Sequence, residues 1–247
     1  GAAVARILAP GHDLLLGGRD HAALATLAAE LPGSRAWPVD LTDTAALAEA
    51  TAGIERLDVL VHSAGVGLLG TVEATPAATW RRQFEVNVVA VAELTRLLLP
   101  ALRAARGRVV LVNSGAGLAA RPGWGSYAAS KFALRAFADA LRAEEADAGV
   151  RVTSVHPGRV DTDMQRAVVA HEGGVYDPRE YLRPESVAGA VLLAVTAPPD
   201  AALTEMQGDL LGRLQAAAQG LAEAATERAR AERVAATAQN SDADGAA

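Results

Sequence analysis

The chain alternates between short apolar runs and longer segments with helical periodicity, and this alternation limits its possible folds most strongly. Strand-like runs lie at residues 12–18, 35–40, 57–62, 108–113, 151–156 and 202–205. Helical patterns lie at residues 1–8, 20–31, 42–50, 75–105, 124–148 and 187–195. Strands that alternate with helices at this spacing are typical of a parallel sheet covered by helices on both faces. The sequence therefore predicts an α/β fold with a doubly wound parallel sheet.

Three helix starts are marked by side chains that can cap a helix. Asp20 and Thr42 each precede a helical pattern, and their side-chain oxygens can accept from free backbone N–H groups. Thr75 precedes Pro76, and proline suits the first position of a helix. We expect helices to begin directly after Asp20, Thr42 and Thr75.

Small and polar residues follow several of the predicted strands. They are Arg19, Asp40, Ser63-Ala64-Gly65, Ser114 and Pro157-Gly158. In an open parallel sheet, ligands bind beyond the carboxyl ends of the strands. We expect these residues to share one edge of the sheet and to form a ligand site there.

A serine, a tyrosine and a lysine provide chemistry at this edge. Lys131 is the only lysine among 23 basic side chains, and Tyr127 stands four residues before it, so a helix would place both on one face. Ser114 follows the strand that ends near Asn113. Such a set can transfer a proton to or from an oxygen. The alternative is a surface lysine beside a half-buried tyrosine on an amphipathic helix.

Composition excludes several classes of protein and site. The chain has 247 residues, no cysteine and a net charge of −6, which suits one large α/β domain and gives no basic surface for nucleic acid. It has no disulfide, no thiolate site and no histidine cluster with the spacing of metal ligands. No apolar run is long enough to span a membrane. We expect a soluble cytoplasmic protein without a metal.

The last segment differs from the rest. Residues 207–247 are rich in alanine, with leucines at helical spacing that give way to a polar end, whereas residues 1–206 carry the α/β pattern. We expect an α/β domain over 1–206 and a helical to disordered extension over 207–247. The extension either docks on the domain or a partner, or is a solvated segment without function.

Taken together, these residues resemble the short-chain dehydrogenase/reductase family over positions 1–206. The matching features are Asp40-Leu41, Ser63-Ala64-Gly65, Asn87, Ser114, Tyr127 with Lys131, and the segment Pro157 to Thr162. The family has asparagine where this chain has Ser63. The resemblance implies a Rossmann-type fold and a nicotinamide cofactor.

The resemblance also implies roles for the reactive residues. Tyr127 would be the general acid/base, and Ser114 would bind the substrate oxygen. Lys131 would lower the pKa of Tyr127 toward neutrality, because a nearby ammonium favours phenolate, and would bind the nicotinamide ribose. Asn87 would support a water that links Lys131 to solvent; alternatively it only breaks or caps a helix.

Cofactor contacts follow from the same resemblance. Asp40 and Leu41 would flank the adenine, and the small residues Ser63, Ala64 and Gly65 would let the backbone approach the cofactor. Pro157, Gly158, Val160 and Thr162 would contact the carboxamide and phosphates. Arg19 favours NADP(H) over NAD(H), because a guanidinium pairs with a 2′-phosphate; alternatively it is an exposed loop residue.

The start of the chain departs from the family pattern. The family opens with a strand and a glycine-rich loop that binds pyrophosphate, and Gly1 corresponds to the last glycine of that loop. We therefore expect a gap in the sheet where the first strand would lie, and a longer natural gene product.

The sequence thus predicts an oxidoreductase that transfers hydride between NADP(H) and a carbonyl or alcohol group of a small organic substrate. The alternative is a non-catalytic member that senses the cofactor or serves as a scaffold. By resemblance, a homodimer or homotetramer is expected, packed through the helices near 76–105 and 124–148.

Overall fold

Six parallel strands form two sheets in the computed structural model, which describes residues 1–198, 201 and 203–208. The first sheet pairs β1 (Leu14–Gly18) with β2 (Ser34–Pro38). The second sheet holds, in spatial order, β3 (Val59–His62), β4 (Arg108–Val112), β5 (Arg151–His156) and β6 (Glu205–Gln207). All pairs are parallel, so the predicted α/β class is confirmed.

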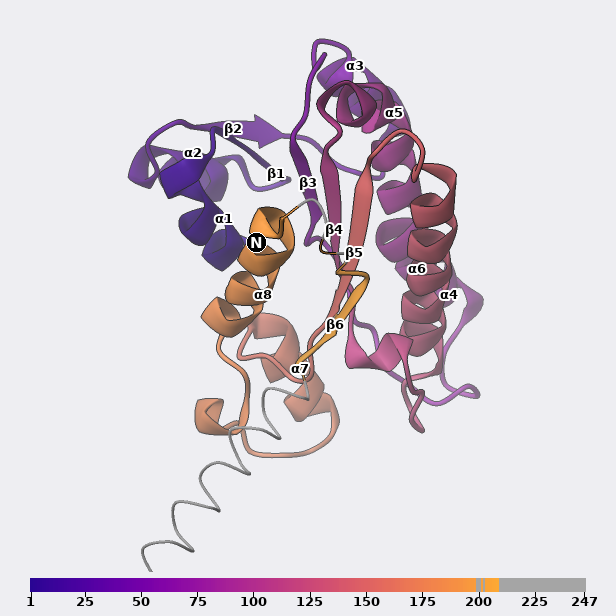
Figure 1. The fold of residues 1–247 in the computed structure, drawn as a ribbon. Coiled ribbons are helices and arrows are strands. Elements are labelled where there is room, and N and C mark those ends of the chain that lie inside the picture. The colour runs from indigo at the N-terminus through magenta and orange to yellow at the C-terminus, as the bar shows by residue number, and fades with distance from the viewer. Residues whose placement is uncertain (199–200, 202, 209–247) are drawn as a thin grey trace, which may run out of the picture. The chain divides into compact units, whose positions relative to one another are not determined.

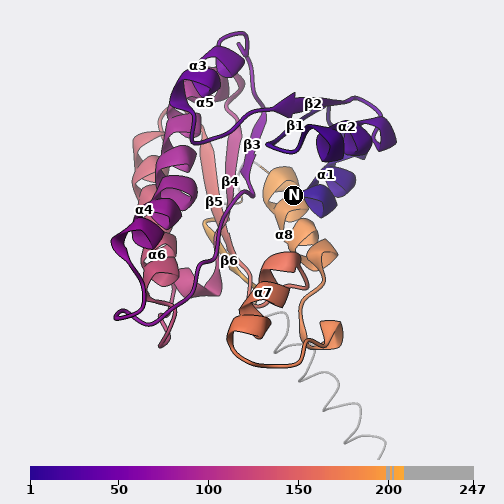
Figure 2. The same cartoon turned by 180° about the vertical axis from the view of Figure 1, so that it is seen from behind.

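Helices alternate with these strands. They are α1 (Ala2–Leu8), α2 (His21–Glu30), α3 (Thr44–Thr51), α4 (Ala77–Phe84), α5 (Ala90–Ala105), α6 (Gly125–Glu144), α7 (Asp163–His171) and α8 (Pro184–Thr196). A π-helical turn, Glu85–Val89, joins α4 to α5. Helices α4, α5 and α6 lie on one face of the second sheet, and α1 and α8 lie on the other (Figures 1 and 2).

The central strand β4 shows why these layers form. Val109 and Leu111 are fully buried in the cluster formed with α5 and α6, whereas Val110 is fully buried in the cluster formed with α1 and α8. Successive side chains of a strand point to opposite faces, so an apolar strand without polar interruptions must be covered on both faces. This continuous apolar run therefore places β4 at the centre of the fold.

The two sheets are separate within the described residues. β1 pairs only with β2, and β3 pairs only with β4, so no ladder of backbone hydrogen bonds joins β1 to β3. The predicted interruption of the sheet is therefore confirmed. Helix α1 packs against α8 beside this interruption and contributes Val4 and Leu8 to the apolar cluster.

Two predicted helix starts are wrong by about one residue. Asp20 caps α2 as predicted, accepting from the Ala23 N–H at 3.0 Å. Helix α3, however, is capped by Asp43 and not by Thr42, because the Thr42 hydroxyl donates to Asp40 at 2.8 Å. Likewise the Thr75 hydroxyl donates back to the Thr71 carbonyl at 2.6 Å, so α4 begins after Pro76 without a side-chain cap.

The end of the described region also differs from the prediction. The last strand is Glu205–Gln207, not 202–205, because Ser154 to His156 of β5 pair with those three residues. Helix α6 ends at Glu144, earlier than the predicted 148. The helical extension predicted over 207–247 lies outside the described residues from position 209 onward.

Candidate active site

The carboxyl ends of three neighbouring strands bring the predicted residues together. Ser63–Gly65 follow β3, Ser114 follows β4, and Pro157 follows β5, with β4 between its two neighbours. Pairing continues past the strand ends, since the Gly115 N–H donates to the Pro157 carbonyl at 2.8 Å. Ser114 therefore lies in a fixed, extended segment at the edge of the sheet.

Tyr127 lies in the first turn of α6, directly above this edge. Tyr127 is only 8% exposed, and the neighbouring Ser114 hydroxyl favours the phenolate form of its side chain. The Ser114 hydroxyl also accepts from the Ala116 N–H at 3.1 Å. Trp124 packs edge-on against the Tyr127 ring, with 5.8 Å between ring centres. The structure thus brings the Ser114 and Tyr127 side chains together. The Ala116 N–H holds Ser114, and the Trp124 ring packs against Tyr127.

Lys131 follows Tyr127 by one helical turn and is 4% exposed. Its ammonium lies 5.9 Å from the centre of the Tyr127 ring and donates a long hydrogen bond of 3.4 Å to the Val112 carbonyl. Within the part of the chain that the structure describes, no carboxylate forms an ion pair with Lys131. Burial therefore lowers the pKa of Lys131 from 10.5 to about 8.

The protonation of Tyr127 follows burial and not the neighbouring cation. Burial raises the pKa of the Tyr127 phenol, while the hydrogen bond from Ser114 favours phenolate and opposes that rise. We expected Lys131 to lower this pKa. The structure gives the opposite direction, because the buried phenolate loses solvation and the Lys131 ammonium is itself destabilised by burial.

Asn87 lies in the π-helical turn between α4 and α5 and is 1% exposed. Its side-chain oxygen accepts from the Val66 N–H at 2.9 Å. Its amide nitrogen donates to the Val66 carbonyl at 2.9 Å and to the Ser130 hydroxyl at 3.0 Å. Asn87 caps no helix. It ties the loop after β3 to α6, and Ser130 in turn donates to the Tyr127 carbonyl at 2.7 Å.

Small residues let the backbone approach these side chains closely. A Cβ on Gly65 would lie 3.3 Å from the Asn87 side-chain oxygen and 3.7 Å from the Lys131 ammonium. A Cβ on Gly1 would lie 4.0 Å from the Ser63 hydroxyl, so Gly1 stands beside the same strand end. Gly1 therefore lies close to Ser63, and Gly65 lies close to both Asn87 and Lys131.

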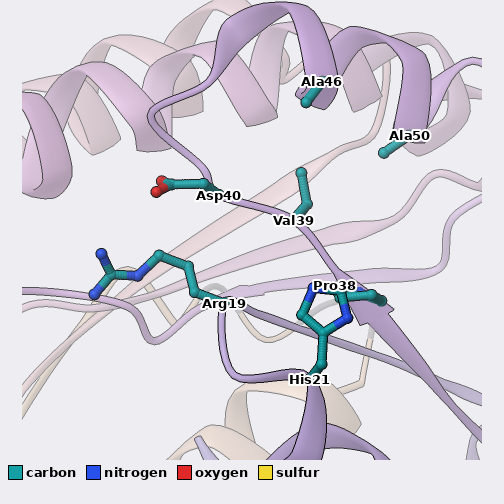
Figure 3. Close-up of a pocket in the computed structure, with 7 residues that line it drawn as sticks. All are labelled: Arg19, His21, Pro38, Val39, Asp40, Ala46 and Ala50. Carbon is teal, nitrogen blue, oxygen red and sulfur yellow. The ribbon is translucent and has the colours of Figure 1, made fainter.

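A pocket of about 410 Å³ lies farther along the edge, beyond β1 and β2. Its lining residues are Arg19, His21, Pro38, Val39, Asp40, Ala46 and Ala50. Figure 3 shows the Arg19 guanidinium and the Asp40 carboxylate on the same side of this pocket. Leu41, predicted beside Asp40, does not line the pocket but packs against the apolar core.

The charges in this pocket are well defined. The Thr42 N–H and hydroxyl donate to Asp40 at 2.9 and 2.8 Å, and these bonds, followed by Arg19 and Arg82, hold the pKa of Asp40 below its ordinary value. Asp40 is therefore ionised at neutral pH. Arg19 is exposed and forms no ion pair with a described residue, so its guanidinium is available to an anionic ligand.

The segment after β5 supplies the remaining predicted contacts. Pro157 is buried, and Val160 forms an isolated parallel bridge with Leu182. The Thr162 hydroxyl caps α7 by accepting from the Gln165 N–H at 3.2 Å. Gly158 lies between these anchors. The segment therefore crosses the same edge of the sheet as Ser114.

Sequence reasoning missed several residues of the site. His21, Ala46 and Ala50 line the pocket because α2 and α3 pack beside the end of β2. No local pattern marks these residues, since each depends on contacts between distant segments.

The described residues contain neither a metal-binding cluster nor a membrane-spanning helix. No group of three or more His, Asp or Glu side chains there is arranged to hold a metal ion. No helix in the same part of the chain has the length and hydropathy needed to cross a membrane.

Comparison with known proteins agrees with this arrangement. Residues 1–173 match the family profile described as short chain dehydrogenase. The chain belongs to the short-chain dehydrogenase/reductase family. It is 34% identical over 181 residues to dehydrogenase/reductase SDR family member 7B of Mus musculus, which covers 68% of this chain and 56% of that protein. The chain thus spans little more than half the length of that relative.

Two other proteins bear on function. The inactive 2-(S)-hydroxypropyl-CoM dehydrogenase 2 of Xanthobacter autotrophicus is 38% identical over 170 residues, covering 66% of this chain and 74% of that protein. An alcohol dehydrogenase from Thermococcus sibiricus, solved with 5-hydroxy-NADP, superposes with a TM-score of 0.75 at 27% identity, covering 84% of this chain and 90% of that one. The superposition confirms for this chain the Rossmann-type fold that the resemblance implied.

Proposed function

We propose that this family member is an oxidoreductase that transfers hydride between NADP(H) and a carbonyl or alcohol group of a small organic substrate. The observation that carries this proposal is the buried set of Ser114, Tyr127 and Lys131 at the end of β4. A buried lysine without a carboxylate partner is costly to keep, and a structural role does not require one. Proton transfer at a neighbouring phenol does require such a buried lysine.

The residues present suit a dinucleotide. The pocket at Arg19 and Asp40 has room for an adenosine moiety, and Arg19 offers a free guanidinium to a 2′-phosphate. At the other end, the close approach of Gly65 to Lys131 leaves space beside the ammonium for a ribose. The neighbour solved with 5-hydroxy-NADP supports the same assignment. NAD(H) is the less favoured cofactor, because the chain has Arg19 where an acidic residue would bond the ribose 2′-hydroxyl.

In this proposal the nicotinamide supplies or accepts the hydride, and the chain's own residues manage the oxygen. Ser114 donates a hydrogen bond to the substrate oxygen and stabilises the negative charge that develops there. In reduction Tyr127 gives its phenolic proton to that oxygen, and in oxidation the phenolate takes the proton from the alcohol.

Lys131 and Asn87 support this proton transfer. A pKa of about 8 lets Lys131, whose ammonium lies 5.9 Å from the centre of the Tyr127 ring, exchange a proton near neutral pH. Asn87 holds Val66 and Ser130 in place, and it supports a water that links Lys131 to solvent. Pro157, Gly158, Val160 and Thr162 would line the nicotinamide end.

Assembly and location belong to the same proposal. We infer a homodimer or homotetramer packed through α6 and the helical segment near 76–105, where Phe132 of α6 and Val89 of the π-helical turn are 41% and 46% exposed. We also infer a cytoplasmic location, which the lack of cysteine supports.

A second candidate is a non-catalytic member that binds the cofactor or a partner. The separation of the two sheets favours it, because the Arg19 pocket and the Ser114 site lie on sheets that no hydrogen-bond ladder joins. One relative of this chain is named as an inactive dehydrogenase, which supports this candidate. Removal of residues 209–247 would abolish partner capture by a scaffold but leave an enzyme's turnover largely unchanged.

The direct test is a screen of aldehydes and ketones with NADPH, in which loss of NADPH absorbance is matched to formation of the alcohol by chromatography. The enzyme reading predicts turnover of at least one carbonyl compound. Binding of NADPH, measured by calorimetry, without turnover of any compound would favour the non-catalytic reading.

A further inference from the structure

His156 is a buried histidine that neither the family pattern nor the proposed mechanism uses. It is the last residue of β5, is 1% exposed, and lies directly before Pro157. Its Nδ1 lies 3.1 Å from the Ser114 carbonyl oxygen. A carbonyl oxygen can only accept, so Nδ1 must carry the hydrogen of this bond. His156 therefore donates directly to the backbone of the serine that holds the substrate oxygen.

This bond is one of three that fix the backbone around Ser114. The Gly117 N–H also donates to the Ser114 carbonyl, at 2.9 Å, and the Gly115 N–H donates to the Pro157 carbonyl at 2.8 Å. Those two bonds are made by the backbone. Only His156 contributes a side chain, so only its bond can be changed by substitution without altering the course of the chain.

The other ring nitrogen of His156 has no hydrogen-bond partner among the described residues. The Nε2 atom lies 3.7 Å from a carboxylate oxygen of Glu205. Burial lowers the pKa of His156, so the ring is neutral with its hydrogen on Nδ1, and the Nε2 lone pair cannot bond to a carboxylate oxygen. Glu205 instead accepts two hydrogen bonds from Arg135 of α6, at 2.6 and 3.2 Å. The Nδ1 bond to Ser114 is therefore the one hydrogen bond of this ring within the described residues.

We propose that His156 is a positioning residue that sets the Ser114 hydroxyl against Tyr127 through its hydrogen bond to the Ser114 carbonyl. This inference rests on the proposed function for its effect on turnover. Its geometric part does not, because the hydrogen bond from His156 to the Ser114 carbonyl exists whatever the substrate is.

Three variants test the proposal. His156→Leu removes both ring nitrogens at similar volume, and His156→Asn keeps an N–H donor where Nδ1 lies. Thr153→Val is the matched control on the same strand: it removes the buried hydroxyl that donates to the Leu203 carbonyl at 2.6 Å, with no contact to Ser114. Each is measured for kcat, for the KM of NADPH, and for the phenol pKa of Tyr127.

The phenol pKa gives a readout that needs no substrate. The chain has three tyrosines, so NMR with ring-labelled tyrosine and a Tyr127→Phe reference identifies the Tyr127 signal. His156→Leu should raise the pKa of Tyr127 further, because a displaced Ser114 no longer favours phenolate. It should also lower kcat about tenfold or more, with the KM of NADPH unchanged within about twofold. His156→Asn should restore both values, and Thr153→Val should change neither.

The outcomes separate the two proposals. A raised Tyr127 pKa in His156→Leu, in a protein that turns over no carbonyl compound, would keep the positioning role and reject the proposed function. Equal effects of His156→Leu and Thr153→Val on kcat and on the Tyr127 pKa would overturn the positioning role. If His156→Leu does not fold, His156→Gln replaces it, because the glutamine N–H donor lies where Nε2 was and not where Nδ1 was. Equal values of kcat and of the Tyr127 pKa in His156→Gln and His156→Asn would then reject the proposal.

Discussion

The Lys131 ammonium lies 5.9 Å from the centre of the Tyr127 ring, and both side chains are buried on one face of α6. Burial acts on the two groups in opposite senses. It lowers the pKa of Lys131 to about 8 and raises the pKa of Tyr127, so the protein favours the neutral form of each. Burial therefore separates the two titrations in pH, and Lys131 loses its proton before Tyr127 does.

The stability of the fold should depend on pH through Lys131. The unfolded chain keeps this proton up to pH 10.5, whereas the folded protein loses it near pH 8, so the free energy of unfolding rises with pH between these values. The contribution is lost as pH falls through about 8, where the buried charge opposes folding by up to about 3 kcal/mol.

Lys131→Met tests this dependence because it keeps the volume and removes the charge. Urea denaturation should find the variant more stable than the wild type at about pH 7, with a smaller difference at about pH 10. The titration of Tyr127 occurs in both proteins and largely cancels in the comparison. A stability difference that stays constant with pH would contradict the burial of a charged Lys131.

Arg19 should decide between the two nicotinamide cofactors. Arg19→Ala removes the guanidinium that would pair with a 2′-phosphate, and we expect NADPH affinity to fall about tenfold or more while NADH affinity changes little. Arg35→Ala is the matched control, since Arg35 is also exposed, lies on β2 and does not line the pocket. Calorimetric titration of all three proteins checks this. Equal losses for the two cofactors in Arg19→Ala would mean that the arginine does not contact the phosphate.

Two glycines in the turn after β4 should respond differently to substitution. A Cβ on Gly117 would lie 2.9 Å from the Lys131 carbonyl oxygen and 3.0 Å from the Asn113 side-chain oxygen, whereas a Cβ on Gly115 would meet only the Pro157 carbonyl, at 3.6 Å. We expect Gly117→Ala to lower the free energy of unfolding by about 1–3 kcal/mol. Gly115→Ala should change it by less than about 0.5 kcal/mol. Urea denaturation of both variants distinguishes them, and similar midpoints would show that the turn adapts freely.

Much of the fold could be predicted because its strands are local apolar runs. The residues Val109 to Val112 need no distant information to be recognised as a buried strand, and the interruption between β1 and β3 followed from the family pattern. The π-helical turn at Glu85–Val89 could not be predicted. It places Asn87, whose partners Val66 and Ser130 lie 21 and 43 residues away in the chain.

The site was predicted unevenly for the same reason. Ser114, Tyr127 and Lys131 follow from short spacings and were found. The direction of the Tyr127 pKa shift was wrong, because it depends on burial, which the sequence does not give. His21 in the pocket and His156 beneath Ser114 were missed, because each acquires its neighbours only when separate elements pack together.

The measurement that tests the account most directly compares NADPH-dependent carbonyl reduction by the wild type and by Tyr127→Phe. Calorimetry and thermal unfolding accompany it, to show that the variant still folds and binds NADPH. We predict turnover by the wild type and a loss of about a hundredfold or more in the variant, with NADPH affinity retained. Equal turnover by the two proteins would show that Tyr127 is not the acid/base and would contradict the account.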